Sequence, residues 1–247
     1  MNPSGGLRWH WRAWRSQRPW QGTREHLAQW LESVQPACDE LLLLGPSAGW
    51  LLPSAFLARF KHVHCWDIDP FAPFLFARRH GAALRAAGVH WTYQRGDAWA
   101  NLDALLAAHP QAAVLFDNLL GQLRFHGPSS GPEAAAHLAA VERRLSRLHR
   151  SLGGREWGSV HDLLSGPGRL AQPGQEPSMR KRKLRAGAPL AQDGWLAGLQ
   201  PQGQWLDHLT AAVFASGTTV YDMAWPFKPG YWHWLQAGWV AARPVKR

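Results

Sequence analysis

Three positions in the first half of the chain could together hold a nucleoside. The loop Gly45-Pro46-Ser47-Ala48-Gly49 follows a short apolar run, and its glycines let a ligand approach the backbone closely. Asp67 follows the next apolar run, where a carboxylate can accept hydrogen bonds from both hydroxyls of a ribose. Asp97 follows a third run, where its carboxylate could accept a hydrogen bond from an exocyclic amine. Their order along the chain predicts an adenosine site.

Two later pairs of polar residues stand at or near the ends of further apolar runs. Asp117 and Asn118 close a fourth run, where they either contact a substrate or satisfy the backbone of a turn. His161 and Asp162 lie on or after a fifth run and could provide a general base or a polar substrate contact. A purely structural role for this histidine is an equal alternative.

Apolar runs and amphipathic stretches alternate along the chain. Runs ended by glycine or a polar residue predict buried strands, and stretches with apolar residues at helical spacing predict helices. We expect strands over 40–44, 62–66, 89–94, 112–116, 157–164, 218–225 and 231–242. We expect helices over 23–34, 51–60, 70–80, 101–108, 132–152 and 204–215, with Thr23 and Asp69 as N-caps.

This alternation predicts a doubly wound, mostly parallel, seven-stranded α/β sheet. Helices cover both faces of such a sheet, and ligands bind beyond the carboxyl ends of its strands. We expect a basic, tryptophan-rich arm over 1–22 and one domain over 23–247. Residues 165–194 combine glycine, proline and glutamine with a basic run, which predicts a flexible insertion in that domain.

The formal net charge of +10 comes from two segments of the chain. Residues 1–24 and 178–188 each hold five basic residues and no acid, so the rest of the chain is balanced. The basic segment 180–185 could contact RNA or another polyanion, or it could be a solvated loop. In the arm, arginines alternate with tryptophans, which favours a packed amphipathic segment over a stacking platform for nucleic acid.

Cysteine content and hydropathy indicate the compartment. Cys38 and Cys65 are too few for a disulfide scaffold and lack the spacing of a zinc site. No apolar run approaches the roughly eighteen residues of a membrane span, and the N-terminus lacks the apolar stretch of a signal peptide. We therefore expect a cytoplasmic protein that neither enters the membrane nor binds a metal.

Over residues 40–118 the sequence resembles the class I S-adenosylmethionine-dependent methyltransferases. In that family a glycine-rich loop after the first strand holds the amino-acid part of the cofactor, an acid ending the second strand binds the ribose, and an acid after the third strand contacts the adenine. The stretch Trp66-Asp67-Ile68-Asp69-Pro70 is similar to the second of these motifs. The resemblance implies that S-adenosyl-L-methionine is bound by Gly45, Ser47, Gly49, Asp67 and Asp97.

The resemblance also implies where the reaction takes place. In the family, methyl transfer occurs where the fourth strand ends, which corresponds to Asp117, Asn118 and Leu119. The last strand of the family's sheet is inserted antiparallel, and the closing pair of predicted strands is similar. The sulfonium supplies the driving force, so the protein mainly aligns the reactants. A base helps only if the nucleophile arrives protonated, and His161 or Asp162 is the candidate. The methyl acceptor does not follow from the sequence.

Three other functions remain open at this point. The fold could serve as a noncatalytic binding module, with 180–185 contacting a polyanion. A nicotinamide-binding enzyme would need glycine where Ser47 and Trp50 stand. The Gly45-to-Gly49 loop also matches the nucleophile elbow of α/β-hydrolases, with His161 downstream, but too few strands precede Ser47.

Overall fold

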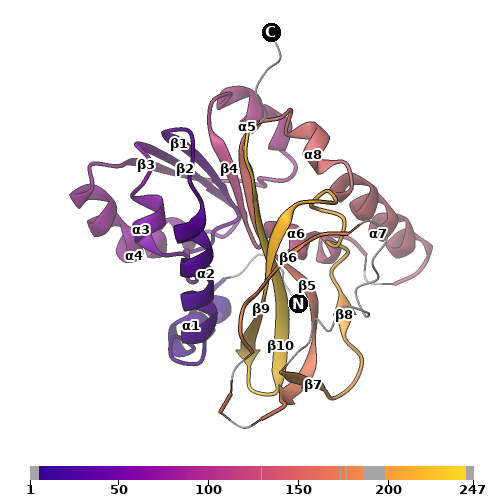
Figure 1. Ribbon diagram of the computed structural model, residues 1–247. Helices are drawn as coiled ribbons and strands as arrows, with labels where there is room; N and C mark the ends of the chain where they lie inside the picture. The colour runs from indigo at the N-terminus through magenta and orange to yellow at the C-terminus, as the bar shows by residue number, and fades with distance from the viewer. Residues whose placement is uncertain (1–5, 129, 173, 176, 186–197, 243–247) are drawn as a thin grey trace.

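A computed structural model describes residues 6–242, apart from 129, 173, 176 and 186–197. Figure 1 shows a strongly twisted sheet that runs through the molecule, with helices on both sides. The strands within the described residues are β1 (Glu40–Leu44), β2 (His62–Asp67), β3 (His90–Arg95), β4 (Ala113–Asp117), β5 (Trp157–Leu170), β6 (Arg180–Lys183), β7 (Leu199–Pro201), β8 (Leu206–Asp207), β9 (Thr219–Lys228) and β10 (Tyr231–Val240).

The strand order across the sheet is β3-β2-β1-β4-β5-β10-β9-β6. Neighbours from β3 to β5 are parallel, whereas β10 lies antiparallel between β5 and β9. This arrangement confirms the predicted α/β class, with a mostly parallel sheet and an antiparallel last strand. Three strands were not expected: β6 pairs with β9, and β7 and β8 pair with the far end of β5.

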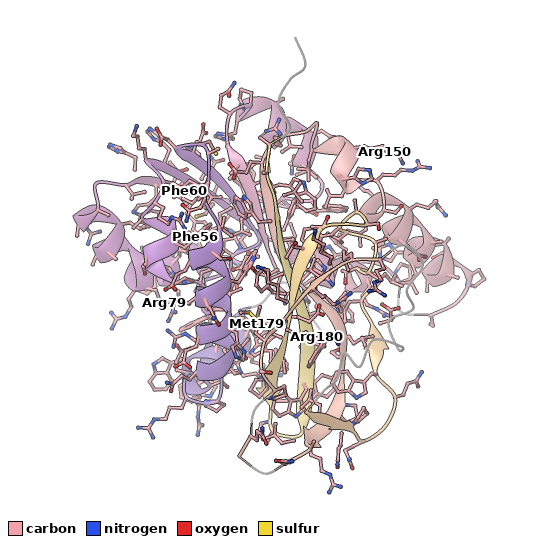
Figure 2. The ribbon with its side chains drawn as sticks, in the orientation of Figure 1. Phe56, Phe60, Arg79, Arg150, Met179 and Arg180 are labelled. Atoms are coloured by element: carbon pink, nitrogen blue, oxygen red, sulfur yellow. The ribbon has the colours of Figure 1, made fainter. Side chains whose placement is uncertain are left out.

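The helices bury their apolar sides against opposite faces of the sheet. Leu41 and Leu43 of β1 share one core with α2, α3 and α4, and Leu42 and Leu44 share the other with α5, α7 and α8. Figure 2 shows Phe56 and Phe60 within the first of these helical layers. The helices are α1 (Leu7–Arg15), α2 (Gln21–Ser33), α3 (Ser54–Leu57), α4 (Ala72–Ala86), α5 (Leu102–Ala108), α6 (Leu119–Gln122), α7 (Pro132–Leu145) and α8 (Leu148–Ser151), with a 3-10 turn over Leu123–Phe125. None of the described helices is both long and apolar enough to cross a membrane.

Several predicted elements are wrong. Residues 204–215 form β8 and turns rather than a helix, because Leu209 adopts a positive φ of 64° and its amide is held by the Asp207 side chain. Residues 165–170 extend β5, and 180–183 form β6, so these parts of the predicted insertion are strands. Its residues 186–194 lie outside the described chain. The predicted helix over 132–152 is divided into α7 and α8, and the one over 51–60 shortens to α3.

The two predicted N-caps are also wrong. Helix α2 begins at Gln21, and the Thr23 hydroxyl instead donates to the Ala224 carbonyl of β9, 2.9 Å away. Helix α4 begins only at Ala72, so Asp69 lies before the helix, where its Oδ1 accepts from the Phe71 amide. Thr23 therefore joins α2 to β9, whereas Asp69 holds the turn that precedes α4.

Candidate functional site

Glycine and two carboxylates meet at the carboxyl edge of the parallel sheet. In the strand register, Leu44 of β1 pairs with Trp66 of β2 on one side and with Phe116 of β4 on the other. The next residues are Gly45, Asp67 and Asp117, which therefore leave the sheet at the same level. Gly45 stands between the two acids and adds no side chain there.

Close packing explains the glycines of the loop after β1. Gly45 and Gly49 have φ values of 74° and 62°, and Ser47 between them also has a positive φ, of 49°. A Cβ on Gly45 would lie 2.7 Å from the Cβ of Leu119 in α6, and a Cβ on Gly49 would lie 2.5 Å from His80 Nε2 in α4. The loop is therefore shaped by the helices packed against it, and any side chain at either glycine would force them apart.

Asp67 organises this loop through backbone hydrogen bonds. Its Oδ2 accepts from the Ser47 amide at 2.7 Å, and its Oδ1 accepts from the Asp69 amide at 2.8 Å. A carboxylate has about four acceptor positions, so lone pairs remain for a ligand. The predicted cofactor residues Gly45, Ser47, Gly49 and Asp67 are thus contiguous in space.

Asp67 and Asp117 have unusual acidities because both are withdrawn from water. Their exposed fractions are 9% and 8%. Burial raises the pKa of Asp67 to about 6, against the lowering effect of its two amide donors. Burial, with the charge of Asp67, raises the pKa of Asp117 to about 8. Among the described residues no donor is bonded to the Asp117 carboxylate, so Asp117 keeps its proton near pH 7 unless a cation approaches.

Asp97 lies farther along the same edge, after β3. Its Oδ1 accepts from the amides of Trp99 and Ala100, each at 2.9 Å, which holds the turn before α5. The side chain is half-buried. Gly96 next to it packs under the indole of Trp66, which an added Cβ would approach to 2.7 Å. Asp97 therefore has a structural role in addition to the adenine contact predicted for it.

Asn118 turns the chain sharply after β4 and reaches Asp162 of β5. Its backbone is left-handed, with a φ of 54°, a conformation that asparagine tolerates better than most residues. Its Nδ2 donates to Asp162 Oδ2 and its Oδ1 accepts from the Asp162 amide, both at 3.0 Å. Gln122 of α6 donates to the same carboxylate oxygen at 3.3 Å. The structure therefore joins two of the predicted acceptor-side residues.

The sequence analysis missed His233 of β10, which completes this group. His233 Nδ1 lies 2.8 Å from Asp162 Oδ1. Burial alone would raise the pKa of Asp162, but the charge and hydrogen bond of His233 hold it at about 2. Because this carboxylate only accepts, Nδ1 carries the hydrogen of this bond, and in a neutral ring Nε2 holds the lone pair. The pair has the form of a histidine base oriented by an acid.

His208 also borders this group but is already engaged. Its Nδ1 donates to the Gly121 carbonyl at 2.7 Å, and its Nε2 accepts from the Ser165 hydroxyl at 2.9 Å. Neither His208 nor His233 belonged to a motif, because they come from a turn and from an otherwise apolar strand. The one sequence signal was a histidine inside the run Tyr231–Val240.

His161 is separated from this base group although it neighbours Asp162 in sequence. Adjacent strand residues point to opposite faces, and His161 packs against Phe214 while its Nδ1 contacts the Ser159 hydroxyl at 2.9 Å. The ring is fully buried, and burial lowers its pKa to about 3. This environment favours the structural alternative for His161 over the base predicted for it.

The N-terminal arm folds over the glycine loop as helix α1. Trp9 Nε1 donates to the Ser47 hydroxyl at 3.1 Å, and the Gly6 amide donates to Asp69 Oδ2 at 3.0 Å. The indole of Trp50 donates to His10 Nδ1, so the ring hydrogen of His10 is on Nε2, which lies 2.9 Å from Asp69 Oδ2. The arm is thus a packed amphipathic segment at this point, as expected.

A continuous group of aromatic rings connects the loop to the base. The ring of Trp9 stacks on that of Phe227, with 5.9 Å between the ring centroids. It contacts the ring of Trp225 edge-on, with 6.2 Å between the centroids. Phe227 and Trp225 in turn contact the His233 imidazole, with ring centroids 4.5 and 5.1 Å from its own. We call Trp9, Trp225, Phe227 and His233 the aromatic wall, because their rings are in contact from the loop to β10.

The hydrolase alternative is not supported by the position of Ser47. Its hydroxyl accepts from Trp9, whereas His161 contacts Ser159. A nucleophile and its base must lie within hydrogen-bonding reach, and this serine and histidine do not. No Ser47–His161 triad is formed.

The basic segment lines a shallow hollow at β6, the last strand in the sheet order. A cavity of about 280 Å³ is bordered by Arg180, Arg182, Lys183 and Arg185. Arg182 pairs with the buried carboxylate of Asp222. Figure 2 labels Met179 and Arg180, where β6 begins.

Comparisons with known proteins give likeness of fold only. No protein-family model matches the sequence, and no curated protein matches it significantly. Among solved structures, the N-terminal domain of EvdMO1 with SAH bound shares 18% identity, covering 90% of this chain and 82% of that one, with a TM-score of 0.40. The glycopeptide N-methyltransferase MtfA shares 12%, covering 90% and 96%, with a TM-score of 0.38. SAM-bound CalS10, an amino pentose methyltransferase from Micromonospora echinaspora, shares 16%, covering 95% and 82%, with a TM-score of 0.30.

Proposed function

We propose that this protein binds S-adenosylmethionine and transfers its methyl group to an acceptor whose identity is open. The observation that carries the proposal is the pair of buried carboxylates, Asp67 and Asp117, on either side of Gly45 at the carboxyl edge of the sheet. Ligands of parallel α/β sheets bind at this edge. The alternative to an enzyme is a noncatalytic binding module, which would bind the cofactor at the same site without transferring its methyl group.

The charge of the cofactor fits the charge of this edge. S-adenosylmethionine carries a positive sulfonium, a positive ammonium and a negative carboxylate near neutral pH, so its net charge is positive. Two buried acids with raised pKa values are stabilised in their charged form by a nearby cation. A neutral or anionic ligand would leave Asp117 protonated near pH 7. The remaining lone pairs of Asp67 suit ribose hydroxyls, and Asp97 is the candidate for the adenine.

The Asp162–His233 pair is our candidate for the proton-accepting group when the methyl acceptor arrives protonated. S-adenosylmethionine supplies an electrophilic methyl group on sulfur. His233 Nε2 can take the proton of an acceptor hydroxyl or amine, while Asp162 stabilises the resulting imidazolium through the 2.8 Å contact. Asn118 and Gln122 hold Asp162 in place. Asp117 remains at the cofactor rather than acting as the base.

Helix α1 and the aromatic wall limit the access of water. Trp9 covers Ser47, and its ring contacts reach His233 through Phe227. Exclusion of water strengthens the electrostatic contacts within a site and suppresses hydrolysis of a reactive group. The arm is therefore part of the proposed site.

Titration of S-adenosylmethionine against wild type and Asp67→Ala tests the proposal. We expect micromolar binding, about 8 kcal/mol, and its loss in the variant, because the loop amides lose their acceptor. Asp103→Ala removes an exposed carboxylate from α5 and should bind like wild type. Circular dichroism verifies that each variant folds. A folded wild-type protein without detectable binding would refute the cofactor assignment.

A second candidate function is contact with a polyanion such as RNA through residues 180–185. The supporting observation is that four basic side chains border one hollow. Affinity for a single-stranded RNA should then fall steeply with salt, since phosphate contacts release counterions. Affinity for S-adenosylmethionine should change little over the same range. Replacing Lys183 and Arg185 by glutamine should reduce the salt slope, and an unchanged slope would exclude this contact.

We also propose a cytoplasmic location. Both described cysteines, Cys38 and Cys65, are free thiols, and free thiols are typical of reducing compartments. Fractionation of the native cells tests this directly, and recovery of the protein from an extracytoplasmic fraction would contradict it.

A further inference from the structure

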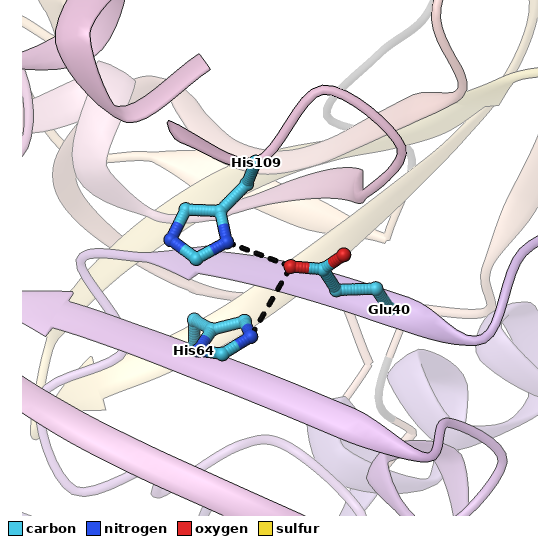
Figure 3. A group of neighbouring side chains, drawn as sticks. All are labelled: Glu40, His64 and His109. Carbon is cyan, nitrogen blue, oxygen red and sulfur yellow. Dashed lines mark hydrogen bonds and ion pairs between the residues drawn. The ribbon is translucent and has the colours of Figure 1, made fainter. Parts of the chain in front are cut away.

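The opposite edge of the sheet holds a group of imidazoles around one carboxylate. Glu40 is the first residue of β1, His64 lies in β2, and His109 follows the last residue of α5. His64 Nε2 and His109 Nδ1 lie 3.2 and 2.7 Å from the same oxygen, Glu40 Oε1. Figure 3 shows both rings turned toward that oxygen from two sides. This group is at the amino ends of the strands and so is separate from the proposed cofactor edge.

We propose that Glu40, His64 and His109 form a binding site for a divalent transition-metal ion, with zinc as the expected occupant. One ligand atom from each residue lies within 4.8 Å of the other two. Zinc binds nitrogen and oxygen ligands at about 2.0–2.2 Å in a tetrahedron, which places ligand atoms about 3.3 Å apart. The 3.2 Å contact already has this spacing, and the 2.7 Å contact needs to open by roughly half an ångström.

The surroundings of His64 fix the ring in the orientation that metal binding needs. Its Nδ1 lies 3.0 Å from the hydroxyl of Thr92 on β3. A hydroxyl can donate or accept, so Thr92 can accept from Nδ1 when the Nε2 lone pair binds the metal.

His109 is held from its backbone rather than from its ring. Arg155 Nη1 donates to the His109 carbonyl at 2.9 Å, and Nη2 donates to the Leu106 carbonyl at 3.2 Å. These contacts fix the end of α5 against the sheet. The centroids of the His109 and His64 rings are 4.3 Å apart, and the ring planes are tilted by 35° to each other.

The three side chains are partly open to solvent, with exposed fractions of 26%, 21% and 20% for Glu40, His64 and His109. An ion can therefore enter without unfolding of the protein, and water can complete the tetrahedron. Two imidazoles and one carboxylate form a ligand set that suits zinc and its neighbours in the first transition row better than calcium or magnesium. The ion would tie β1, β2 and the end of α5 together.

Zinc titration of the full chain tests this site. We expect one tightly bound zinc in wild type, with affinity reduced at least about 100-fold in His64→Ala and His109→Ala and about 10-fold in Thr92→Val. His149→Ala removes an exposed imidazole from α8 and should leave affinity unchanged. Equal zinc affinity and stoichiometry in wild type and the His64→Ala/His109→Ala double variant would overturn the proposal.

Anomalous diffraction from zinc-loaded wild-type crystals provides a second readout that does not depend on variants. A peak about 2.0–2.2 Å from Glu40, His64 and His109 is expected. A peak only at the buried Asp162, His208 and His233 group, whose ligand atoms also lie close together, would contradict the assignment. No peak at either place would contradict it as well.

Discussion

Asp117 is a residue whose chemistry conflicts with the stability of the fold. Its carboxylate is buried at the end of β4, beside Asp67, and no donor among the described residues neutralises it. A group of this kind is retained when a ligand supplies the missing charge. By contrast, Asp162 is just as buried, but its pKa is low because His233, His208 and Asn118 surround it. Asp117 therefore has hydrogen-bonding capacity left for a ligand, whereas Asp162 already has its partners within the protein.

This contrast predicts how Asp117→Asn changes stability with pH. The folded pKa of Asp117 is raised from 3.8 to about 8, so the unfolded chain loses this proton first and wild-type stability falls as pH rises through that window. The variant lacks this loss. Its advantage in free energy of unfolding should grow by about 3–4 kcal/mol between pH 5 and pH 8. Urea unfolding at both pH values measures it, and a pH-independent difference would show that the carboxyl is not strained.

Helix α1 packs over the loop with one side and exposes the other side to solvent. On its inner side His10 and Ala13 are buried and Trp9 reaches the loop. On its outer side Trp11 and Trp14 are 58% and 61% exposed, with their rings 5.4 Å apart. The alternation of arginine and tryptophan in the sequence therefore encodes an amphipathic helix.

The two sides of α1 offer a matched pair of substitutions. Trp9→Ala removes ring contacts with Trp20, Trp225 and Phe227 and the bond to Ser47, and we expect it to lower the free energy of unfolding by about 2–3 kcal/mol. Trp11→Ala removes an exposed indole and should change it by less than about 0.5 kcal/mol. Chemical denaturation of both variants decides the point. Equal effects would mean that the arm does not pack on the loop in solution.

Across the whole molecule, the parallel half of the sheet was the most predictable part. β1 to β4 are short, and each either ends at aspartate or is followed by glycine, so local sequence marks where they end. The prediction of a helix over 204–215 was wrong. Its apolar residues, which include Val213 and Phe214, lie in turns and pack in the core around Trp157. Tertiary contacts overrode the local pattern there.

The candidate sites were predictable to different degrees, depending on whether local sequence or contacts between distant residues form them. Gly45 and Asp67 are set by position at strand ends, so their proximity followed from the topology. His233 lies 71 residues from its partner Asp162, and the Glu40, His64 and His109 group comes from three elements. Contacts between side chains so distant in sequence leave no motif, which is why the base pair and the metal group were missed.

The most direct test of the central claim is the number of protons released when S-adenosylmethionine binds. A cation beside Asp117 lowers its pKa below about 8, so binding at pH 7 should release up to about one proton, and S-adenosylhomocysteine, which lacks the sulfonium charge, should release fewer. Calorimetry in buffers with different ionisation enthalpies measures this number. We predict proton release in wild type and almost none in Asp117→Asn. Binding without proton release, or equal release in wild type and the variant, would contradict the account.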